Sequence, residues 1–126
     1  MSRVIHFEIS ADNVDRAVAF YRKVFDWFIE KWDSPIEYWL VTTGPDHLRG
    51  IDGAILKRVL PSGFSTINTI SVDSIEMMVK KVIDAGGAKF TEIETIPGIG
   101  QFCYCTDTEG NHFGLMQSFS ESRISK

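Results

Sequence analysis

Apolar and polar residues alternate along several parts of this chain, and two stretches change to the spacing of a helix. Within residues 3–10, Ile5, Phe7 and Ile9 alternate with His6, Glu8 and Ser10, which predicts a β-strand with one apolar face and one face that carries His6 and Glu8. Asn13 is a preferred helix N-cap, and the apolar residues after it recur at the three- and four-residue spacing of a helix over 14–25. The pattern therefore predicts a strand followed by a helix that covers its apolar face.

The same order of elements occurs twice, at a constant offset of 61 residues. The corresponding pairs include Ile9 and Ile70, Ser10 and Ser71, Asn13 and Ser74, and Gly53 and Gly114. The predicted strands are 3–10, 27–33, 37–43 and 51–58 in the first half and 64–72, 88–96, 100–106 and 112–118 in the second. The second helix begins at Ser74 and stops at Gly86 and Gly87. We expect a single domain over 1–126, with modules at about 1–60 and 64–118 and a tail at 119–126.

Composition and charge exclude several classes of protein. The chain has 126 residues, 44% of them hydrophobic, and a formal net charge of −4 at pH 7, as is typical of one globular domain. Its basic residues form no run, so we expect no nucleic-acid partner. No apolar stretch reaches the roughly 18–20 residues of a membrane span, and residues 1–10 lack a secretory signal, so we expect a cytoplasmic protein with no membrane partner. Cys103 and Cys105 are poorly spaced for a mutual disulfide and are predicted to be free packing thiols.

Several local motifs occur in an order that resembles one known family. They are the helix entry at 12–17 with Phe20 and Tyr21 at its end, the second helix entry at 72–75 with its double glycine, the turn at 97–101, and the hairpin at 107–115, where Thr108 replaces the usual proline. With the repeat, they resemble the vicinal oxygen chelate superfamily, which includes glyoxalase I, extradiol dioxygenases and bleomycin-resistance proteins. This resemblance implies an α+β fold of two tandem βαβββ modules, whose curved mixed sheets form an incomplete barrel around a cleft. It also implies a homodimer.

The same resemblance gives four positions for metal ligands, on the first and last strands of each module. They fall on His6, Gly53, Ile67 and Gly114. Only His6 has a side chain that can coordinate an ion, whereas a protein-bound divalent ion normally has at least three protein ligands. We therefore expect neither the usual metal centre nor another cofactor. Glu8 and His112, each two residues from one of these positions, are the only obvious substitutes, and a divalent metal held with their help is the alternative.

His6 is the first candidate for a functional side chain. A neutral imidazole can donate and accept a hydrogen bond, so His6 is predicted to contact a ligand or, with Glu8, to act in catalysis as a proton-transfer group. The alternatives are a histidine satisfied by its neighbours and a Glu8 that meets solvent or Lys57. Tyr38 and Trp39 are consecutive on a predicted strand, so one of them faces the interior, and alternation does not decide which.

The candidate ligand-binding positions are those expected to line the cleft. They are His6, Trp39, Gly53, Ile67, Gln101, His112, Gly114 and Met116. The two glycines either leave space for a ligand beside the backbone or only permit curvature and close packing of the sheets. Such a wall is mostly apolar and suits a small organic molecule.

Two functional hypotheses follow from these patterns. The first is a glyoxalase-like small-molecule binding protein that lacks the usual metal centre. The second is a metal-assisted lyase, isomerase or dioxygenase that acts on a vicinally oxygenated small molecule, with His6 as base or residual ligand. A third hypothesis makes the chain a domain of a larger assembly. The sequence has no G-x-S-x-G elbow, P-loop or H-E-x-x-H motif, which argues against the serine-hydrolase, phosphate-binding and zinc-protease classes.

Overall fold

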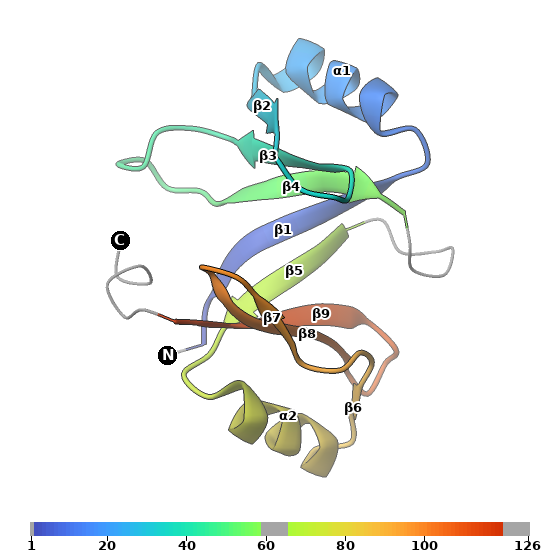
Figure 1. Cartoon of the computed structure of the whole chain (residues 1–126), viewed down its shortest axis with the longest axis vertical. Coiled ribbons are helices and arrows are strands. Elements are labelled where there is room, and N and C mark those ends of the chain that lie inside the picture. Colours follow the sequence, from blue (N-terminus) through green and yellow to red (C-terminus); the bar gives the residue numbers. More distant parts are fainter. Residues whose placement is uncertain (1, 59–65, 120–126) are drawn as a thin grey trace. The chain divides into compact units, whose positions relative to one another are not determined.

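The computed structural model describes residues 2–58 and 66–119, and these residues form two compact units. The first unit contains residues 6–58 with 66 and 67, and the second unit contains residues 2–5 with 68–119. Each unit has one helix and its own strands (Figure 1), so the predicted α+β fold is confirmed. Within the described residues, no helix is both long and apolar enough to span a membrane.

The first unit places one helix beside four strands. Its elements are β1 (Val4–Ala11, from His6 onward), α1 (Val14–Phe25), β2 (Phe28–Lys31), β3 (Tyr38–Thr42) and β4 (Asp52–Lys57). The strands are hydrogen-bonded in the order β2-β3-β4-β1, with β1 parallel to β4 and the other pairs antiparallel. The predicted elements of this half match these bounds to within two residues.

Helix α1 covers one side of this sheet. It begins where the side chain of Asn13 accepts a hydrogen bond from the backbone N–H of Arg16 at 3.0 Å, as predicted for an N-cap. It ends at Asp26, whose backbone is left-handed with a φ of 62°. Between α1 and the sheet lies a core that consists of Ala11, Val14, Val18, Ile29, Val41 and Ile55.

The other side of the sheet carries the polar residues of β1. Side chains alternate between the two faces of a strand, so the neighbours of the core residues point away from α1. This side is called the far face of the first unit, and it carries His6, Glu8, Tyr38, Asp52 and Ala54. The predicted division of β1 into an apolar and a polar face is confirmed.

The second unit repeats this plan, with two short strands in place of one. Its elements are β5 (Thr66–Ser71, from residue 68 onward), α2 (Ile75–Asp84), β6 (Ala88–Lys89), β7 (Glu94–Ile96), β8 (Gly100–Thr106) and β9 (His112–Ser118). The order is β5-β9-β8-β6, β7 also pairs with β8, and β5 is parallel to β9. The first two residues of the predicted strand 64–72, and the predicted tail beyond residue 119, lie outside the described residues.

The predicted single strand at 88–96 is wrong, because the structure has two short strands there. The backbone N–H groups of Phe90 and Thr91 both donate to the carbonyl oxygen of Tyr104, at 2.8 and 3.1 Å. The Thr91 hydroxyl also accepts from the backbone N–H of Tyr104 at 2.9 Å. Two residues thus share one position of the β8 ladder, which interrupts the strand between β6 and β7.

Helix α2 covers one side of the second sheet. Its N-cap is Ser74, as predicted, with the side-chain oxygen 3.3 Å from the backbone nitrogen of Met77. The core beneath it consists of Val72, Ile75, Val79, Cys103, Cys105 and Leu115. Both thiols are free and fully buried, and burial raises the pKa of Cys103 to about 12. These cysteines are therefore packing residues and not nucleophiles.

The repeat is shifted by one residue in its last strand. Both helix caps keep the predicted offset of 61 residues. In the parallel strand pairs, however, Glu8 lies opposite Ala54, and its counterpart Thr69 lies opposite Gly114. Ala54 is therefore the counterpart of Gly114, and the predicted match of Gly53 with Gly114 is wrong. Because side chains alternate with a period of two, this shift places Gly53 on the helix-facing side and Gly114 on the far side.

Candidate functional site

Three polar side chains on the far face of the first unit are joined by hydrogen bonds. The Tyr38 hydroxyl donates to Oε2 of Glu8 at 3.0 Å, and the Tyr38 oxygen lies 3.1 Å from Nε2 of His6. Glu8 is buried, with 6% of its surface exposed, whereas His6 and Tyr38 are half-buried. These residues are called the His6–Tyr38–Glu8 network, and they are the candidate functional site.

Tyr38 reaches His6 and Glu8 across an intervening strand. β4 lies between β1 and β3, which carries Tyr38. Opposite Glu8, this strand has Ala54, which is fully buried. Because position 54 carries only a methyl group, the phenol of Tyr38 can extend over β4 toward β1.

The network determines which nitrogen of His6 carries the hydrogen. A phenol has one hydroxyl hydrogen, and that of Tyr38 is donated to the Glu8 carboxylate, which only accepts. The Tyr38 oxygen must then accept from His6, so the hydrogen of the neutral imidazole sits on Nε2. Nδ1 keeps its lone pair, which makes it the acceptor and the base of this histidine.

Burial keeps His6 mainly neutral. Desolvation lowers the pKa of His6 below its ordinary value of 6.5, and the nearby carboxylates of Glu8 and Asp52 only partly offset this effect. Asp52 lies opposite His6 on β4, and its Oδ1 accepts hydrogen bonds from the backbone N–H and the hydroxyl of Thr43 at 2.8 and 3.3 Å. The histidine at this site therefore acts as a neutral group at pH 7.

We expect His6 to reduce the stability of the protein as the pH falls below neutrality. In the unfolded chain His6 takes up a proton near pH 6.5, whereas the folded protein binds that proton only at lower pH. The unfolded state then holds more protons between these two values, so the free energy of unfolding decreases as the pH falls through this window. Urea unfolding at about pH 7.5 and about pH 5.5 measures the effect, and the wild type should lose more stability than His6→Gln. His47→Gln, which alters an exposed histidine, serves as the control; an equal loss in the wild type and His6→Gln would contradict the prediction.

The structure places Tyr38, and not Trp39, on the sheet face of His6 and Glu8, and it places Asp52 on the same face. Trp39 packs against the core beneath α1, and Tyr38 lies on the far face. The sequence does contain a signal for this choice, because Trp39 alternates with the wholly apolar Val41 and so continues the core-facing stripe. Asp52 has no comparable signal, since only the register of β4 against β1 brings it opposite His6.

Three of the predicted ligand-binding positions lie on helix-facing sides. Trp39 packs in the first core, and Gln101 alternates along β8 with the buried cysteines beneath α2. Gly53 lies opposite Phe7, and a Cβ at Gly53 would meet the Phe7 ring at 2.5 Å. Packing against Phe7 therefore requires the glycine at 53. None of the three shares a face with the His6–Tyr38–Glu8 network.

Three of the other predicted positions, all in the second unit, lie on the strand face that points away from α2. They are His112, Gly114 and Met116. Ile67 belongs to the first unit and is buried. A Cβ at Gly114 would lie 2.7 Å from the ring of Phe102, which covers this glycine. The ring of His112 meets that of Phe90 edge-on, with centroids 4.5 Å apart. This side of the second unit is therefore largely apolar and aromatic.

The side chains present do not fit the metal centre of the resembled family. Three of its four ligand positions hold Gly53, Ile67 and Gly114, which have no donor atoms in their side chains. Among the described residues, no three His, Cys, Asp or Glu side chains lie close enough together to hold an ion. One oxygen of Glu8 is already engaged by Tyr38. That the protein works without this metal stays a prediction, for which a measurement is given below.

Solved structures of other proteins have the same fold. A hypothetical protein, BH1468 from Bacillus halodurans C-125, matches with a TM-score of 0.72 and 13% identity over 95% of this chain and 96% of its own. A variant of methylmalonyl-CoA epimerase from Streptomyces coelicolor, in complex with 2-nitronate-propionyl-CoA, matches with a TM-score of 0.68 and 13% identity over 94% and 98%. The same enzyme from Mycobacterium tuberculosis matches with a TM-score of 0.67 and 12% identity over 96% and 91%.

These structural neighbours have the vicinal oxygen chelate fold, so this chain has it too. The resemblance predicted from the sequence motifs is confirmed at the level of the fold. No protein-family model and no curated protein matches the sequence.

Proposed function

We propose that the protein binds a small organic molecule at the His6–Tyr38–Glu8 network and does so without a metal centre. The observation that carries this proposal is the hydrogen-bonded network itself. It holds polar groups in fixed positions on one face of the sheet. Because the imidazole hydrogen of His6 is on Nε2, Nδ1 keeps its lone pair and can accept a hydrogen bond from a ligand. Such a group binds a hydroxyl or an N–H of a ligand.

An aromatic surface beside the network supports a ligand with an apolar part. The ring of Trp32 meets that of Tyr38 edge-on, with centroids 5.5 Å apart. Binding sites for small molecules combine a few fixed polar groups with aromatic walls of this kind. A small molecule with one hydrogen-bond donor next to a planar or apolar group suits this arrangement.

Native mass spectrometry of freshly purified protein, followed by calorimetry, tests this proposal. Three probes represent the candidate ligand classes. They are catechol, the hemithioacetal that forms from glutathione and methylglyoxal, and methylmalonyl-CoA. For a retained molecule or a probe that binds, we expect His6→Ala and Tyr38→Phe each to weaken affinity by about tenfold, because each removes one hydrogen-bonding group. His47→Gln alters an exposed histidine outside the network and should leave the affinity for the ligand unchanged. Equal affinity of the wild type and His6→Ala would overturn the proposal.

A second candidate function is proton transfer on the bound molecule. The observation in its favour is that Nδ1 of His6 is basic while Nε2 is linked through Tyr38 to Glu8. An epimerase among the structural neighbours agrees with this chemistry. Nδ1 of His6 would accept a proton from an acidic C–H group of the bound molecule and return it to the same carbon, so the carbon skeleton of that molecule is unchanged. If deuterium from D2O is incorporated into methylmalonyl-CoA by the wild type but not by His6→Ala, the result supports catalysis. If methylmalonyl-CoA binds tightly without deuterium exchange, the result contradicts catalysis and supports binding only.

Elemental analysis of the purified protein tests the metal-free part of the proposal. We expect less than one equivalent of any divalent ion, and no change in ligand affinity after treatment with EDTA. The donor set described above is the reason for this expectation. A stoichiometric ion that is lost in His6→Ala would instead favour the metal-assisted lyase, isomerase or dioxygenase.

A homodimer in the cytoplasm completes the proposal. Large apolar side chains are exposed on α1 and β2, among them Val24, Phe25 and Phe28. Exposed apolar surface of this kind is typical of a subunit interface. Light scattering of the purified protein measures the mass directly.

A further inference from the structure

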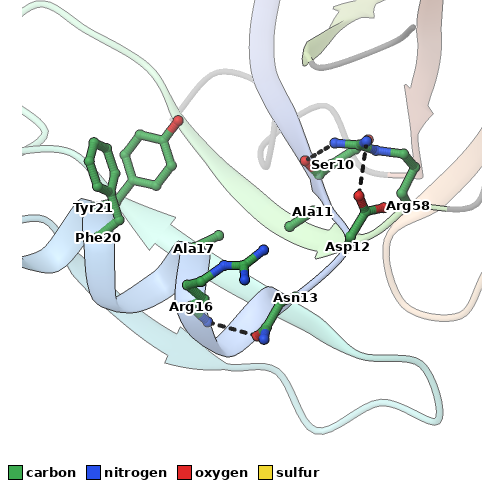
Figure 2. A pocket seen from close by; sticks show the side chains of 9 residues that line it. All are labelled: Ser10, Ala11, Asp12, Asn13, Arg16, Ala17, Phe20, Tyr21 and Arg58. Atoms are coloured by element: carbon green, nitrogen blue, oxygen red, sulfur yellow. Dashed lines mark hydrogen bonds and ion pairs between the residues drawn. The ribbon is translucent and has the colours of Figure 1, made fainter. Parts of the chain in front are cut away.

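A hollow lies at the start of α1, outside the network described above. It has a volume of about 430 Å³ and is formed where the parallel strands β1 and β4 end beside the helix (Figure 2). The residues that line it are Ser10, Ala11, Asp12, Asn13, Arg16, Ala17, Phe20, Tyr21 and Arg58. Its size is within the range of pockets that hold small organic ligands.

Two arginines give the hollow a positive end. Arg58 is held there by hydrogen bonds to the carbonyl oxygen of Ser10 at 3.2 Å and to Asp12 at 3.5 Å. Nε of Arg58 is covered and has no hydrogen-bond partner among the described residues. The Arg16 guanidinium extends from the first turn of α1 toward the turn that carries Asp12 (Figure 2), and no described residue bonds to it.

Among the described residues that line the hollow, positive charge exceeds negative charge. Asp12 is the only carboxylate among the lining residues, against two guanidinium groups. Lys57 adds a further cation at the rim, where its ammonium group donates to the backbone carbonyl of Asp12 at 2.6 Å. The unsatisfied N–H groups at the start of α1 carry partial positive charge as well. The excess of guanidinium groups over carboxylates among the lining residues favours an anionic ligand at this end.

Aromatic rings form the opposite end of the hollow. Figure 2 shows the rings of Phe20 and Tyr21 together on α1, away from Arg58. They meet edge-on with centroids 5.1 Å apart. The Tyr21 ring also stacks parallel to the ring of Trp27, with centroids 5.2 Å apart, which holds it in place. Phe20 is 55% exposed, so its ring has surface left for another group. A flat apolar group can pack on this end.

We propose that this hollow is a second binding site, which takes an aromatic carboxylate. The carboxylate pairs with Arg16 and Arg58, whose planar guanidinium groups match its two oxygens. The ring system packs on Phe20 and Tyr21. A plain inorganic anion would use only the positive end, and a neutral aromatic molecule only the other end, so a ligand with both groups binds best.

Calorimetry with 2-naphthoate tests the site, with methyl 2-naphthoate and inorganic phosphate as matched probes. We expect 2-naphthoate to bind at least about tenfold more tightly than either, because each matched probe lacks one of the two interactions. Arg16→Gln and Arg58→Gln should each weaken the affinity of the protein for 2-naphthoate by about tenfold or more. Phe20→Ala should weaken the affinity for 2-naphthoate but not the affinity for phosphate. Added salt should also weaken 2-naphthoate binding.

Lys23→Gln is the control, because it removes a positive charge from the last turn of α1, away from the hollow. Its affinity for 2-naphthoate should equal that of the wild type. His6→Ala should also leave this affinity unchanged, so the result is independent of the function proposed for the network. Arg16 is exposed, so Arg16→Gln provides the test even if Arg58→Gln fails to fold. The proposal is overturned if 2-naphthoate fails to bind at about 10 mM, if Arg16→Gln binds it unchanged, or if phosphate binds equally well.

Discussion

Replacement of Gly53 by alanine lowers the free energy of unfolding by about 2–3 kcal/mol and the melting temperature by roughly 6–12 °C. A Cβ at this position would meet the ring of Phe7 at 2.5 and 2.6 Å and would also press on the Phe7 carbonyl oxygen. The ring is packed in the core with Trp27, at a centroid distance of 6.1 Å, and the carbonyl belongs to the neighbouring strand β1. Neither group can move without disturbing the first core, so the substitution is destabilising.

Gly44→Ala is the matched control for this substitution. Nothing lies within 4 Å of a Cβ at Gly44, so we expect a change of less than about 0.5 kcal/mol in urea unfolding. The comparison also decides a functional question. A neutral Gly53→Ala would mean that the Phe7 ring yields easily and that the space beside Gly53 is open to a ligand. A large loss would assign this glycine to packing.

Tyr38→Phe should lower the free energy of unfolding by about 2 kcal/mol at pH 7. The phenol hydroxyl donates to the buried carboxylate of Glu8, and hydrogen bonds to charged groups contribute more than neutral ones. The substitution keeps the ring and its contact with Trp32, so the loss reports the hydroxyl alone. It also removes the acceptor of His6 Nε2–H, and nitrogen NMR of the imidazole should then show a smaller share of the Nε2–H form.

A double-mutant cycle separates the network from a general loss of stability. If Tyr38 acts through Glu8, the effects of Tyr38→Phe and Glu8→Gln are not additive, and we expect a coupling of about 1–2 kcal/mol. Tyr21→Phe removes a hydroxyl that forms no hydrogen bond with a described residue, and it should change stability by less than about 0.5 kcal/mol. Additive effects, or an unchanged ratio of His6 tautomers in Tyr38→Phe, would show that the network does not operate as described.

The alternation of side chains and the helix caps made much of the fold predictable. Strand β1 has the predicted polar and apolar faces, and both helices begin at the predicted residues, Asn13 and Ser74. These features depend on interactions between residues that are close in sequence, such as an N-cap side chain and a backbone N–H three residues later. The order of the local motifs was enough to predict the vicinal oxygen chelate fold, with which the structural neighbours agree.

The membership of the site was predictable only in part. His6 and Glu8 share a face because they are two residues apart on one strand, and the sequence alone shows this. Tyr38 joins them from thirty residues away, and its hydroxyl reaches them because Ala54 leaves room on the strand between. Asp52 joins through the register of β4 against β1.

The sheet faces on which Gly53 and Gly114 lie could not be determined from the sequence alone. Gly53 and Gly114 correspond in the sequence repeat, yet a one-residue difference in strand register gives them opposite faces and different neighbours, Phe7 and Phe102. Local sequence therefore determined the elements, their caps and their two-faced character. The pairing of strands determined which faces meet, because register depends on hydrogen bonds and packing between residues far apart in the chain.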